Sequence, residues 1–149
     1  MVSAITILCG PPCSGKTTYA REHAVAGDVV LDYDELMAEL SGMPLYYQPF
    51  SLRGEAERVF QERAAAMRQG WIIRSAPRKE QRGYLRELYH ARSLVLIVPA
   101  AICIARLELT GRPADVKLRQ REYVYEWHRQ YTPSTSPEER MEVSLEVRR

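Results

Sequence analysis

The chain has 149 residues, of which 46% are hydrophobic and 27% are charged. This length and composition predict a single folded domain over residues 1–149 and exclude a largely disordered chain. The formal net charge of +2 gives no indication of a nucleic-acid partner, and we expect no membrane span because no apolar run approaches roughly 18 residues. The three cysteines form neither a disulfide framework nor a zinc pattern, so a reducing cytoplasm is the expected location.

The predicted elements alternate between strands and helices. Short apolar runs rich in β-branched residues predict buried strands, and longer stretches with helix-forming composition or one apolar face predict helices. In chain order these are strand 4–9, helix 15–26, strand 28–32, helix 34–41, loop 42–52, helix 53–69, strand 71–76, helix 79–91, strand 93–98, helix 100–109, helix 115–131, polar loop 132–138 and edge strand 141–147. The alternation predicts an α/β fold with a mostly parallel sheet of about five strands and helices on both faces.

A glycine-rich loop follows the first predicted strand. Residues 10–17, GPPCSGKT, fit the pattern G-x-x-x-x-G-K-[ST] between a strand and a helix, which is the context of a phosphate-binding loop. The two glycines let backbone amides curl toward a phosphate group, and the helix N-terminus adds its positive dipole end. Lys16 is suited to neutralising phosphate charge, and the Thr17 hydroxyl to binding Mg²⁺. The pattern predicts the three-layer P-loop NTPase fold, with ATP and Mg²⁺ as cofactors.

The residues expected to bind the nucleotide are Gly10, Pro11, Pro12, Cys13, Ser14, Gly15, Lys16, Thr17 and Thr18. Cys13 has two interpretations within this loop. Its thiol is either a reactive group whose pKa the helix N-terminus lowers, or a small side chain that only fills space.

Two aspartates stand at the end of the second predicted strand. Asp32 and Asp34 are two residues apart, so in a strand-like segment both carboxylates point to the same face. One carboxylate is then suited to accept a proton from an attacking hydroxyl, and the other to help hold Mg²⁺. The alternative is that Asp34 only caps the short helix that follows.

The string GPPCSGKTTYARE at 10–22, followed by LDYDEL at 31–36, resembles the phage-type polynucleotide 5′-kinases and related phage DNA kinases that act on modified bases. This resemblance implies that Asp34 is the general base, because the base of that family is an aspartate after the second strand. Shikimate and gluconate kinases share the same skeleton, and the shikimate kinases also carry an Asp-x-Asp at this point. The resemblance implies the cytoplasm of a bacterium or of a phage-infected host cell as the location.

The sequence departs from the polynucleotide kinase pattern at two places. The family usually has an arginine shortly after the base, where this chain has Glu35, Leu36 and Met37. The third strand usually ends in an aspartate, where this chain has residues 73–76, Ile-Arg-Ser-Ala. These departures put the nucleic-acid acceptor in doubt more than the kinase chemistry. They also leave Asp32 as the candidate that helps Thr17 with the metal ion.

Related kinases carry a short arginine-bearing lid after the fourth strand and its helix, which places a lid near 106–115 in this chain. Arg106 lies on the predicted helix and Arg112 in a Gly/Pro turn suited to hinge motion. Both are candidates for stabilising the charge of the migrating phosphoryl group. The alternative is that both are solvated surface charges, which is the default interpretation for Arg119 and Arg121.

The loop before the long helix is where related kinases build the acceptor pocket. It carries Tyr46 and Tyr47, whose rings either stack on a base or sugar or pack within the loop. Arg74, at the end of the third strand, is a candidate for contacting substrate or phosphate. Together with Asp34, these residues are the predicted acceptor site. A closed pocket around them favours a small acceptor, and a shallow basic groove favours nucleic acid.

The leading hypothesis is an ATP- and Mg²⁺-dependent phosphotransferase that moves the γ-phosphate to a hydroxyl. Its leading acceptor is a nucleic-acid hydroxyl, either a polynucleotide 5′-hydroxyl or the hydroxymethyl group of a modified base. The second hypothesis keeps this chemistry but uses a small molecule or nucleotide as the acceptor. The third is a module whose ATP state switches a partner contact without phosphorylating an acceptor. The expected partners are ATP and a nucleic acid or small hydroxyl compound, with no membrane.

Overall fold

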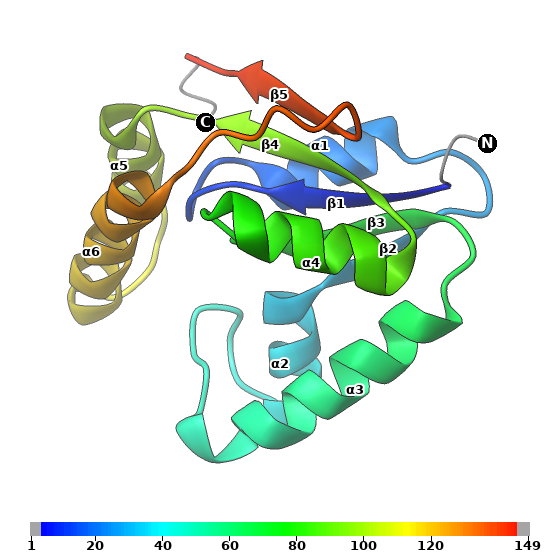
Figure 1. The fold of residues 1–149 in the computed structure, drawn as a ribbon. Coiled ribbons are helices and arrows are strands. Elements are labelled where there is room, and N and C mark those ends of the chain that lie inside the picture. Colours follow the sequence, from blue (N-terminus) through cyan, green and yellow to red (C-terminus); the bar gives the residue numbers. More distant parts are fainter. Residues whose placement is uncertain (1–3, 146–149) are drawn as a thin grey trace.

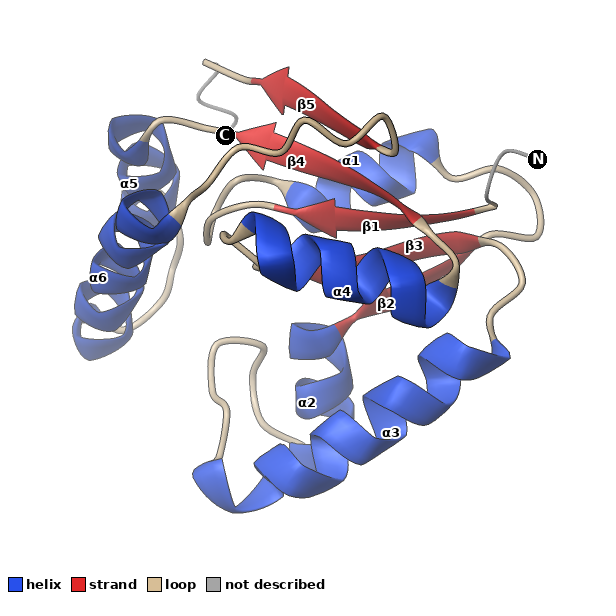
Figure 2. Cartoon of the chain, in the orientation of Figure 1, coloured by secondary structure: helices blue, strands red, loops and turns tan. Residues whose placement is uncertain are grey.

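A five-stranded sheet forms the centre of the computed structural model, which describes residues 4–145 (Figures 1 and 2). The strand order is β2-β3-β1-β4-β5, and every neighbouring pair is parallel. The strands are β1 (Ile5–Cys9), β2 (Val29–Asp32), β3 (Gly70–Arg74), β4 (Arg92–Ile97) and β5 (Glu139–Val143). The predicted α/β sheet of about five strands is confirmed, and the phosphate-binding loop follows its central strand.

Helices and one short 3₁₀ turn connect the strands. They are α1 (Lys16–His23), α2 (Tyr33–Ser41), η1 (Phe50–Leu52), α3 (Arg53–Ala66), α4 (Lys79–Tyr89), α5 (Ala100–Glu108) and α6 (Ala114–Gln130). Two predicted helices end earlier than expected. The helix predicted over 15–26 ends at His23, and the helix predicted over 53–69 ends at Ala66, because Ala24 and Met67 adopt extended backbone at the two ends.

The sheet has two covered faces. Alternate residues of β1 point to opposite sides, so Ile5, Ile7 and Cys9 join one buried cluster and Leu8 joins another. The first cluster includes Phe60 of α3 and side chains of α2, α4 and α6, and the second includes a side chain of α1. In Figure 1, α4 accordingly lies on the near face of the sheet and α1 behind it.

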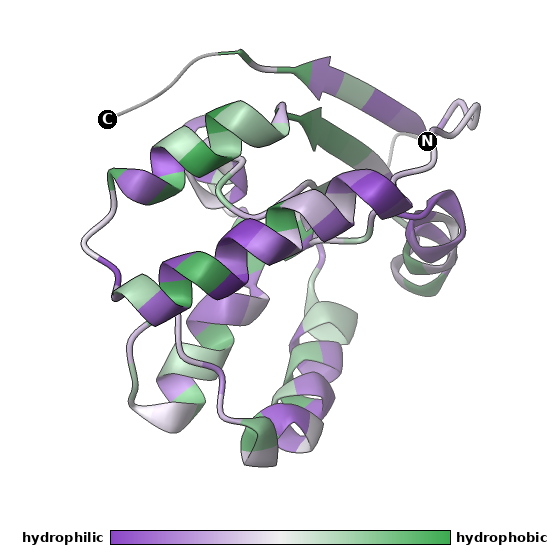
Figure 3. Ribbon diagram, turned by 90° about the vertical axis from the view of Figure 1, so that its left-hand side faces the viewer, coloured by the Kyte–Doolittle hydropathy of each residue, from purple (hydrophilic) through white to green (hydrophobic). Residues whose placement is uncertain are grey.

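The carboxyl-terminal segment adds the fifth strand at the edge of the sheet. The edge strand predicted over 141–147 is confirmed, although it covers Glu139–Val143 and its last predicted residues lie outside the described part of the chain. Figure 3 shows the contrast between the hydrophobic β4 and the more hydrophilic β5 beside it. In residues 4–145, none of the helices combines the length and apolar character needed to cross a bilayer.

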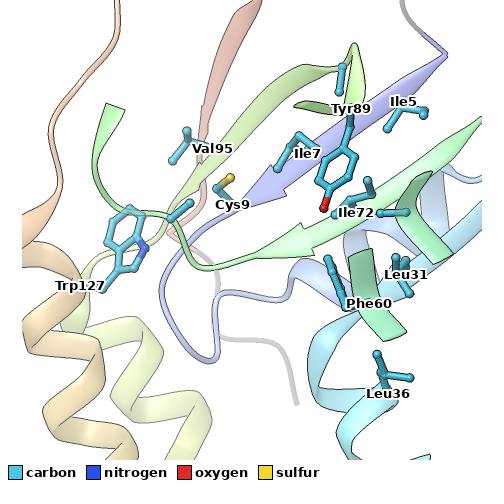
Figure 4. Close-up of a cluster of buried hydrophobic side chains, with 13 residues drawn as sticks. Ile5, Ile7, Cys9, Leu31, Leu36, Phe60, Ile72, Tyr89, Val95 and Trp127 are labelled. Carbon is cyan, nitrogen blue, oxygen red and sulfur yellow. The ribbon is translucent and has the colours of Figure 1, made fainter. Parts of the chain in front are cut away.

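Trp127 of α6 belongs to the core. Its side chain is only 4% exposed and its Nε1 donates a hydrogen bond to the carbonyl oxygen of Ser75 at 2.7 Å. The ring stacks on Tyr131, with 5.1 Å between ring centroids. Figure 4 shows Trp127 in the same cluster as Cys9 and Val95. These contacts anchor α6 to the sheet.

Candidate active site

A cleft of about 750 Å³ opens at the carboxyl ends of β2 and β3, beside the phosphate-binding loop. Ligands of parallel α/β sheets bind at this edge, where the strands point their last residues. The loop 43–49 and the first half of α6 contribute to the walls of the cleft. The lining residues that the sequence predicted for the site are Pro12, Lys16, Asp32, Asp34, Tyr46, Tyr47 and Arg74, and Arg119, expected on the surface, also lines the cleft. The fold therefore brings the predicted base, the P-loop lysine and the predicted acceptor residues into one cavity.

The phosphate-binding loop needs its glycines for two different reasons. A Cβ added at Gly10 would lie 2.9 Å from the carbonyl oxygen of Leu96 and 2.8 Å from Oγ of Ser14, so the loop passes too close to β4 for any larger residue. Gly15 has φ +86°, a left-handed conformation that favours glycine. Cys13 has φ 61° and is strained, as residues at ligand-binding loops often are.

Polar groups of this loop fit an anionic ligand. The Nζ of Lys16 donates hydrogen bonds to the carbonyl oxygens of Gly10 and Pro11, both at 2.8 Å. Burial lowers the pKa of Lys16, while the carboxylates of Asp34 and Asp32 raise it. The Oγ of Ser14 is buried without a hydrogen-bond partner among the described residues. A lysine folded onto its own loop and an orphaned buried hydroxyl are what a polyphosphate would engage on binding.

Thr17 and Asp32 meet as the predicted metal pair requires. The Thr17 hydroxyl donates a hydrogen bond to Oδ2 of Asp32. Throughout residues 4–145, no group of three or more His, Cys, Asp or Glu side chains is placed to hold a metal ion. Mg²⁺ commonly binds through one or two protein oxygens together with phosphate and water oxygens. The Thr17–Asp32 pair fits that kind of shared site.

The helix cap at the end of β2 differs from the expectation. Asp32 is the N-cap of α2, since its Oδ1 accepts a hydrogen bond from the backbone N–H of Asp34 at 2.8 Å. Asp34 already lies in the first helical turn and not in an extended segment. The alternative that Asp34 caps the helix is therefore wrong, and so is the extended conformation from which a shared face of the two carboxylates was predicted. Both carboxylates nevertheless line the cleft, because the first turn of α2 faces it.

Asp34 has the environment of a proton acceptor. Its side chain is in contact with the solvent of the cleft. The protein around the cleft nevertheless removes part of the water around the carboxylate, and this desolvation raises the pKa of Asp34. The negative charge of Asp32 raises that pKa further. Lys16, a hydrogen bond from Gln48, and Arg112 act in the opposite direction. The Gln48 contact was not predicted, because a glutamine in a proline-containing loop has no sequence signature of its own.

Arg74 is held within the protein. Both of its terminal nitrogens lie 3.3 Å from carboxylate oxygens of Glu57, and its guanidinium lies over the rings of Tyr33 and Phe60 at 5.3 Å and 4.9 Å from their centroids. This arrangement separates the acceptor cleft from a second hollow of about 450 Å³ between α3 and α4. The lining residues that were not among the predicted acceptor contacts include Arg53, Gln120 and Tyr123.

The two candidate lid arginines both lie against the phosphate-binding loop. Nη1 of Arg106 donates a hydrogen bond to the carbonyl oxygen of Cys13 at 3.3 Å, and its Nη2 lies 3.4 Å from Oγ of Ser144. Nη1 of Arg112 lies 3.9 Å from Sγ of Cys13 and hydrogen-bonds the side chain of Gln120. The connection between α5 and α6 covers only residues 109–113, and this short turn carries Arg112, which contacts the phosphate-binding loop.

The contacts of Arg121 and the environment of Cys13 bear on the two interpretations that the sequence left open for them. Arg121 pairs with Glu108 on the surface, which agrees with its default interpretation. Burial raises the pKa of the Cys13 thiol, although Arg112 and Lys16 oppose this effect. The raised pKa favours the interpretation of Cys13 as a small residue that fills space.

Comparison with known proteins agrees with this geometry. The sequence matches a family described as AAA domain over residues 5–132. Similar solved structures include a gluconokinase from Sinorhizobium meliloti 1021, with a TM-score of 0.60 and 19% identity over 95% of this chain and 82% of that chain. A shikimate kinase from Bacteroides thetaiotaomicron has a TM-score of 0.57 and 19% identity over 93% of this chain and 84% of that chain.

A shikimate kinase from Acinetobacter baumannii in complex with shikimate has a TM-score of 0.58 and 14% identity over 97% of this chain and 86% of that chain. A search of curated proteins finds no match to the sequence. None of these similar proteins is described as a polynucleotide kinase, so the resemblance is supported only at the level of P-loop kinases. The chain belongs to the AAA domain family and has the fold of a P-loop kinase.

Proposed function

We propose that this protein is a kinase that transfers the γ-phosphoryl group of ATP to a hydroxyl group of a small molecule. The observation that carries the proposal is the single cleft that joins Lys16 of the phosphate-binding loop to Asp34 and to the loop with Tyr46 and Tyr47. A kinase needs its phosphate-binding loop, its proton acceptor and its acceptor site within one cavity, because both substrates must meet in line.

Different residues in and beside the cleft are suited to the separate tasks of phosphate binding, Mg²⁺ binding and proton transfer. The loop amides and Lys16 would bind the phosphates, and Thr17 with Asp32 would hold Mg²⁺. When bound, Mg²⁺ offsets the charge that develops on the transferring phosphoryl group. Asp34 accepts the proton of the acceptor hydroxyl as its oxygen bonds to the γ-phosphorus and the bond to the β-phosphate oxygen breaks.

Positive charge near the loop completes the site. Arg106 and Arg112 both contact Cys13, so each lies beside the phosphates that the loop would bind. An arginine at this place lowers the barrier by balancing charge on the migrating group, an effect that is larger where water is excluded. The short turn 109–113 allows Arg112 to move as the nucleotide enters.

The size and charge of the cleft support a small acidic acceptor. Its volume of about 750 Å³ lies within the range of small-molecule sites. Arg53, Arg74 and Arg119 line it, and Glu57 is the one lining carboxylate apart from Asp32 and Asp34. The solved structures of similar fold are described as a gluconokinase, a sugar kinase and shikimate kinases. A hydroxyl compound that also carries a carboxylate or phosphate group fits these observations.

A nucleic-acid acceptor has weaker support than the sequence motifs suggested. The net charge is only +2, and nucleic-acid sites usually present a continuous basic surface. The cleft has walls formed by the loop 43–49 and α6. The small-molecule alternative of the sequence analysis is therefore the better-supported reading.

The proposal is tested by phosphoryl transfer from γ-labelled ATP with Mg²⁺. The acceptors offered are sugar acids, hydroxy acids of the shikimate type, nucleosides, nucleotides and 5′-hydroxyl oligonucleotides. We expect label on a small anionic acceptor with the wild-type protein and little label with Asp34→Asn. Label on oligonucleotides alone would restore the nucleic-acid hypothesis. No transfer to any acceptor, with ATP bound, would contradict the proposed function and favour the nucleotide-switched module.

A further inference from the structure

The side chain of Gln48 contacts the carboxylate of Asp34, the proposed proton acceptor. It lies near the end of the loop 42–49, and its side-chain amide donates a hydrogen bond to Oδ1 of Asp34, 14 residues earlier in the chain. Within the described part of the protein, this is the one hydrogen bond made by the Asp34 carboxylate. Oδ2 therefore stays available toward the cleft.

The chemistry of the pair suits a fixed orientation. A neutral amide cannot accept the proton of an acceptor hydroxyl, so Gln48 is not itself a base. Its N–H donates to a charged oxygen, which makes the bond stronger than one between neutral groups. Without this donor the Asp34 side chain, in the first turn of α2, is free to adopt other rotamers in the open cleft.

The loop that carries Gln48 also forms a wall of the acceptor site. Met43, Leu45, Tyr46 and Tyr47 line the same cleft. Both Gln48 and Asp34 are exposed to the water in the cleft, and an acceptor that enters would displace this water. A hydrogen bond that loses competing water becomes stronger. An acceptor that contacts this loop would therefore also affect the Asp34 carboxylate, because Gln48 joins the loop to that carboxylate.

We propose that Gln48 is a positioning residue that holds the carboxylate of Asp34 in the orientation for proton transfer and links that orientation to closure of the loop 42–49 over the acceptor. This inference rests on the proposed function, since it assigns Asp34 as the proton acceptor. According to this inference, Gln48 affects turnover only by orienting Asp34, although the two residues lie on different elements, the loop 42–49 and α2.

The kinetic test compares Gln48→Leu with wild type, and repeats the comparison in the Asp34→Ala background. Leucine has a similar volume but no amide. We expect kcat to fall by about 10- to 100-fold in the wild-type background, the range seen for residues that orient a catalytic group, with an acceptor KM that changes less than about threefold. In the Asp34→Ala background the same substitution should leave kcat unchanged, because the group that Gln48 positions is absent.

The matched control is Gln61→Leu, on an exposed position of α3 outside the acceptor cleft, for which kcat should equal that of wild type. A Gln48→Leu protein with wild-type kcat would overturn the proposal. So would an equal loss of kcat in the wild-type and Asp34→Ala backgrounds, since that result would give Gln48 a role independent of Asp34.

A second measurement separates this inference from the proposed function. The side-chain amide signals of Gln48 in a ¹H–¹⁵N NMR spectrum are assigned by their loss in Gln48→Leu, and they need no acceptor. They should shift in Asp34→Ala while the signals of Gln61 stay in place. If no acceptor is found, kcat is measured for the slow hydrolysis of ATP, in which water takes the place of the acceptor. Unshifted Gln48 signals would overturn the inference even if a kinase activity is established.

Discussion

The buried guanidinium of Arg82 forms an ion pair with the carboxylate of Glu139, with 2.7 Å between Nε and Oε1. Arg82 also donates hydrogen bonds to the carbonyl oxygens of Ala76, Pro77 and Thr132. This one side chain therefore connects three places in the chain. They are the segment just after β3, the start of the carboxyl-terminal segment at Thr132, and Glu139, the first residue of β5. The segment continues to Ser144, whose Oγ lies 3.4 Å from Nη2 of Arg106, and Arg106 in turn contacts the phosphate-binding loop at Cys13.

The first prediction concerns this ion pair. Glu139→Gln should lower the free energy of unfolding by about 3–5 kcal/mol, because it leaves the buried charge of Arg82 without its counterion. Arg86 loses the same partner, since its Nη1 lies 3.1 Å from Oε1 of Glu139. Urea unfolding followed by circular dichroism measures the change. The neighbouring exposed substitution Glu138→Gln should alter stability by less than about 0.5 kcal/mol. Equal stabilities of the two variants would show that the pair does not hold β5.

The second prediction concerns nucleotide binding. Lys16→Ala should abolish measurable ATP binding in isothermal titration calorimetry, because it removes the cation at the base of the phosphate-binding loop. Lys79→Ala changes a lysine at the start of α4, away from the cleft, and should bind ATP as wild type does. ATP binding retained by Lys16→Ala would contradict the assignment of this loop.

The third prediction separates binding from chemistry. Asp34→Asn should leave the Kd for ATP nearly unchanged and lower kcat by about 10²–10⁴-fold, the contribution of a general base. The measurement is initial-rate transfer to the acceptor identified in the transfer assay, alongside calorimetry of ATP binding. Normal turnover by Asp34→Asn would exclude Asp34 as the base and direct attention to Asp32.

The fourth prediction concerns the two arginines beside Cys13. Arg106→Ala and Arg112→Ala should each lower kcat by about 10²–10³-fold, because each removes a positive charge that stabilises the negatively charged migrating phosphoryl group. Arg121→Ala, which breaks only the surface pair with Glu108, should retain wild-type kcat. If only one of the two variants loses activity, that residue supplies the transition-state charge and the other has a structural role.

The fifth prediction uses the cysteines as pH-dependent reporters. Burial raises the pKa of Cys9 to about 12 and that of Cys103 to about 11, so at pH 8 only about one thiol in 10⁴ and one in 10³, respectively, is ionised. Because the thiolate is the reactive form, both should resist iodoacetamide in the folded protein, and labelling should speed up as the pH rises. Cys13 is partly exposed and should be labelled first.

ATP with Mg²⁺ should slow the labelling of Cys13, since this residue lies inside the phosphate-binding loop. Mass spectrometry of the labelled peptides distinguishes the three sites. Labelling of Cys9 as fast as that of Cys13 would contradict the burial of β1, and labelling of Cys13 that ATP leaves unchanged would contradict binding at the loop.

Local sequence was sufficient to predict the parallel sheet, the phosphate-binding loop and the two aspartates of the site. The phosphate-binding loop is a continuous motif, Asp32 is the last residue of the next strand, and Asp34 comes two residues later. In a parallel α/β sheet the ends of such strands meet at one edge, so their proximity to Lys16 follows from topology. The aromatic loop with Tyr46 and Tyr47 was predicted from the resemblance to related kinases, which build their acceptor pocket at this place in the chain.

Other features were decided only by tertiary packing. The contacts of Gln48 with Asp34, of Arg74 with Glu57 and of Arg82 with Glu139 join residues that are 14, 17 and 57 positions apart. No periodicity marks such pairs, because each depends on how a loop or a helix is laid against the sheet. The choice of Asp32 over Asp34 as the helix cap was also outside the reach of the sequence, since both residues are good caps and a single hydrogen bond to the backbone N–H of Asp34 selects between them. The sequence by itself thus determined the elements and the phosphate-binding motif, whose signals are contiguous, and the tertiary structure decided which distant side chains orient and support them.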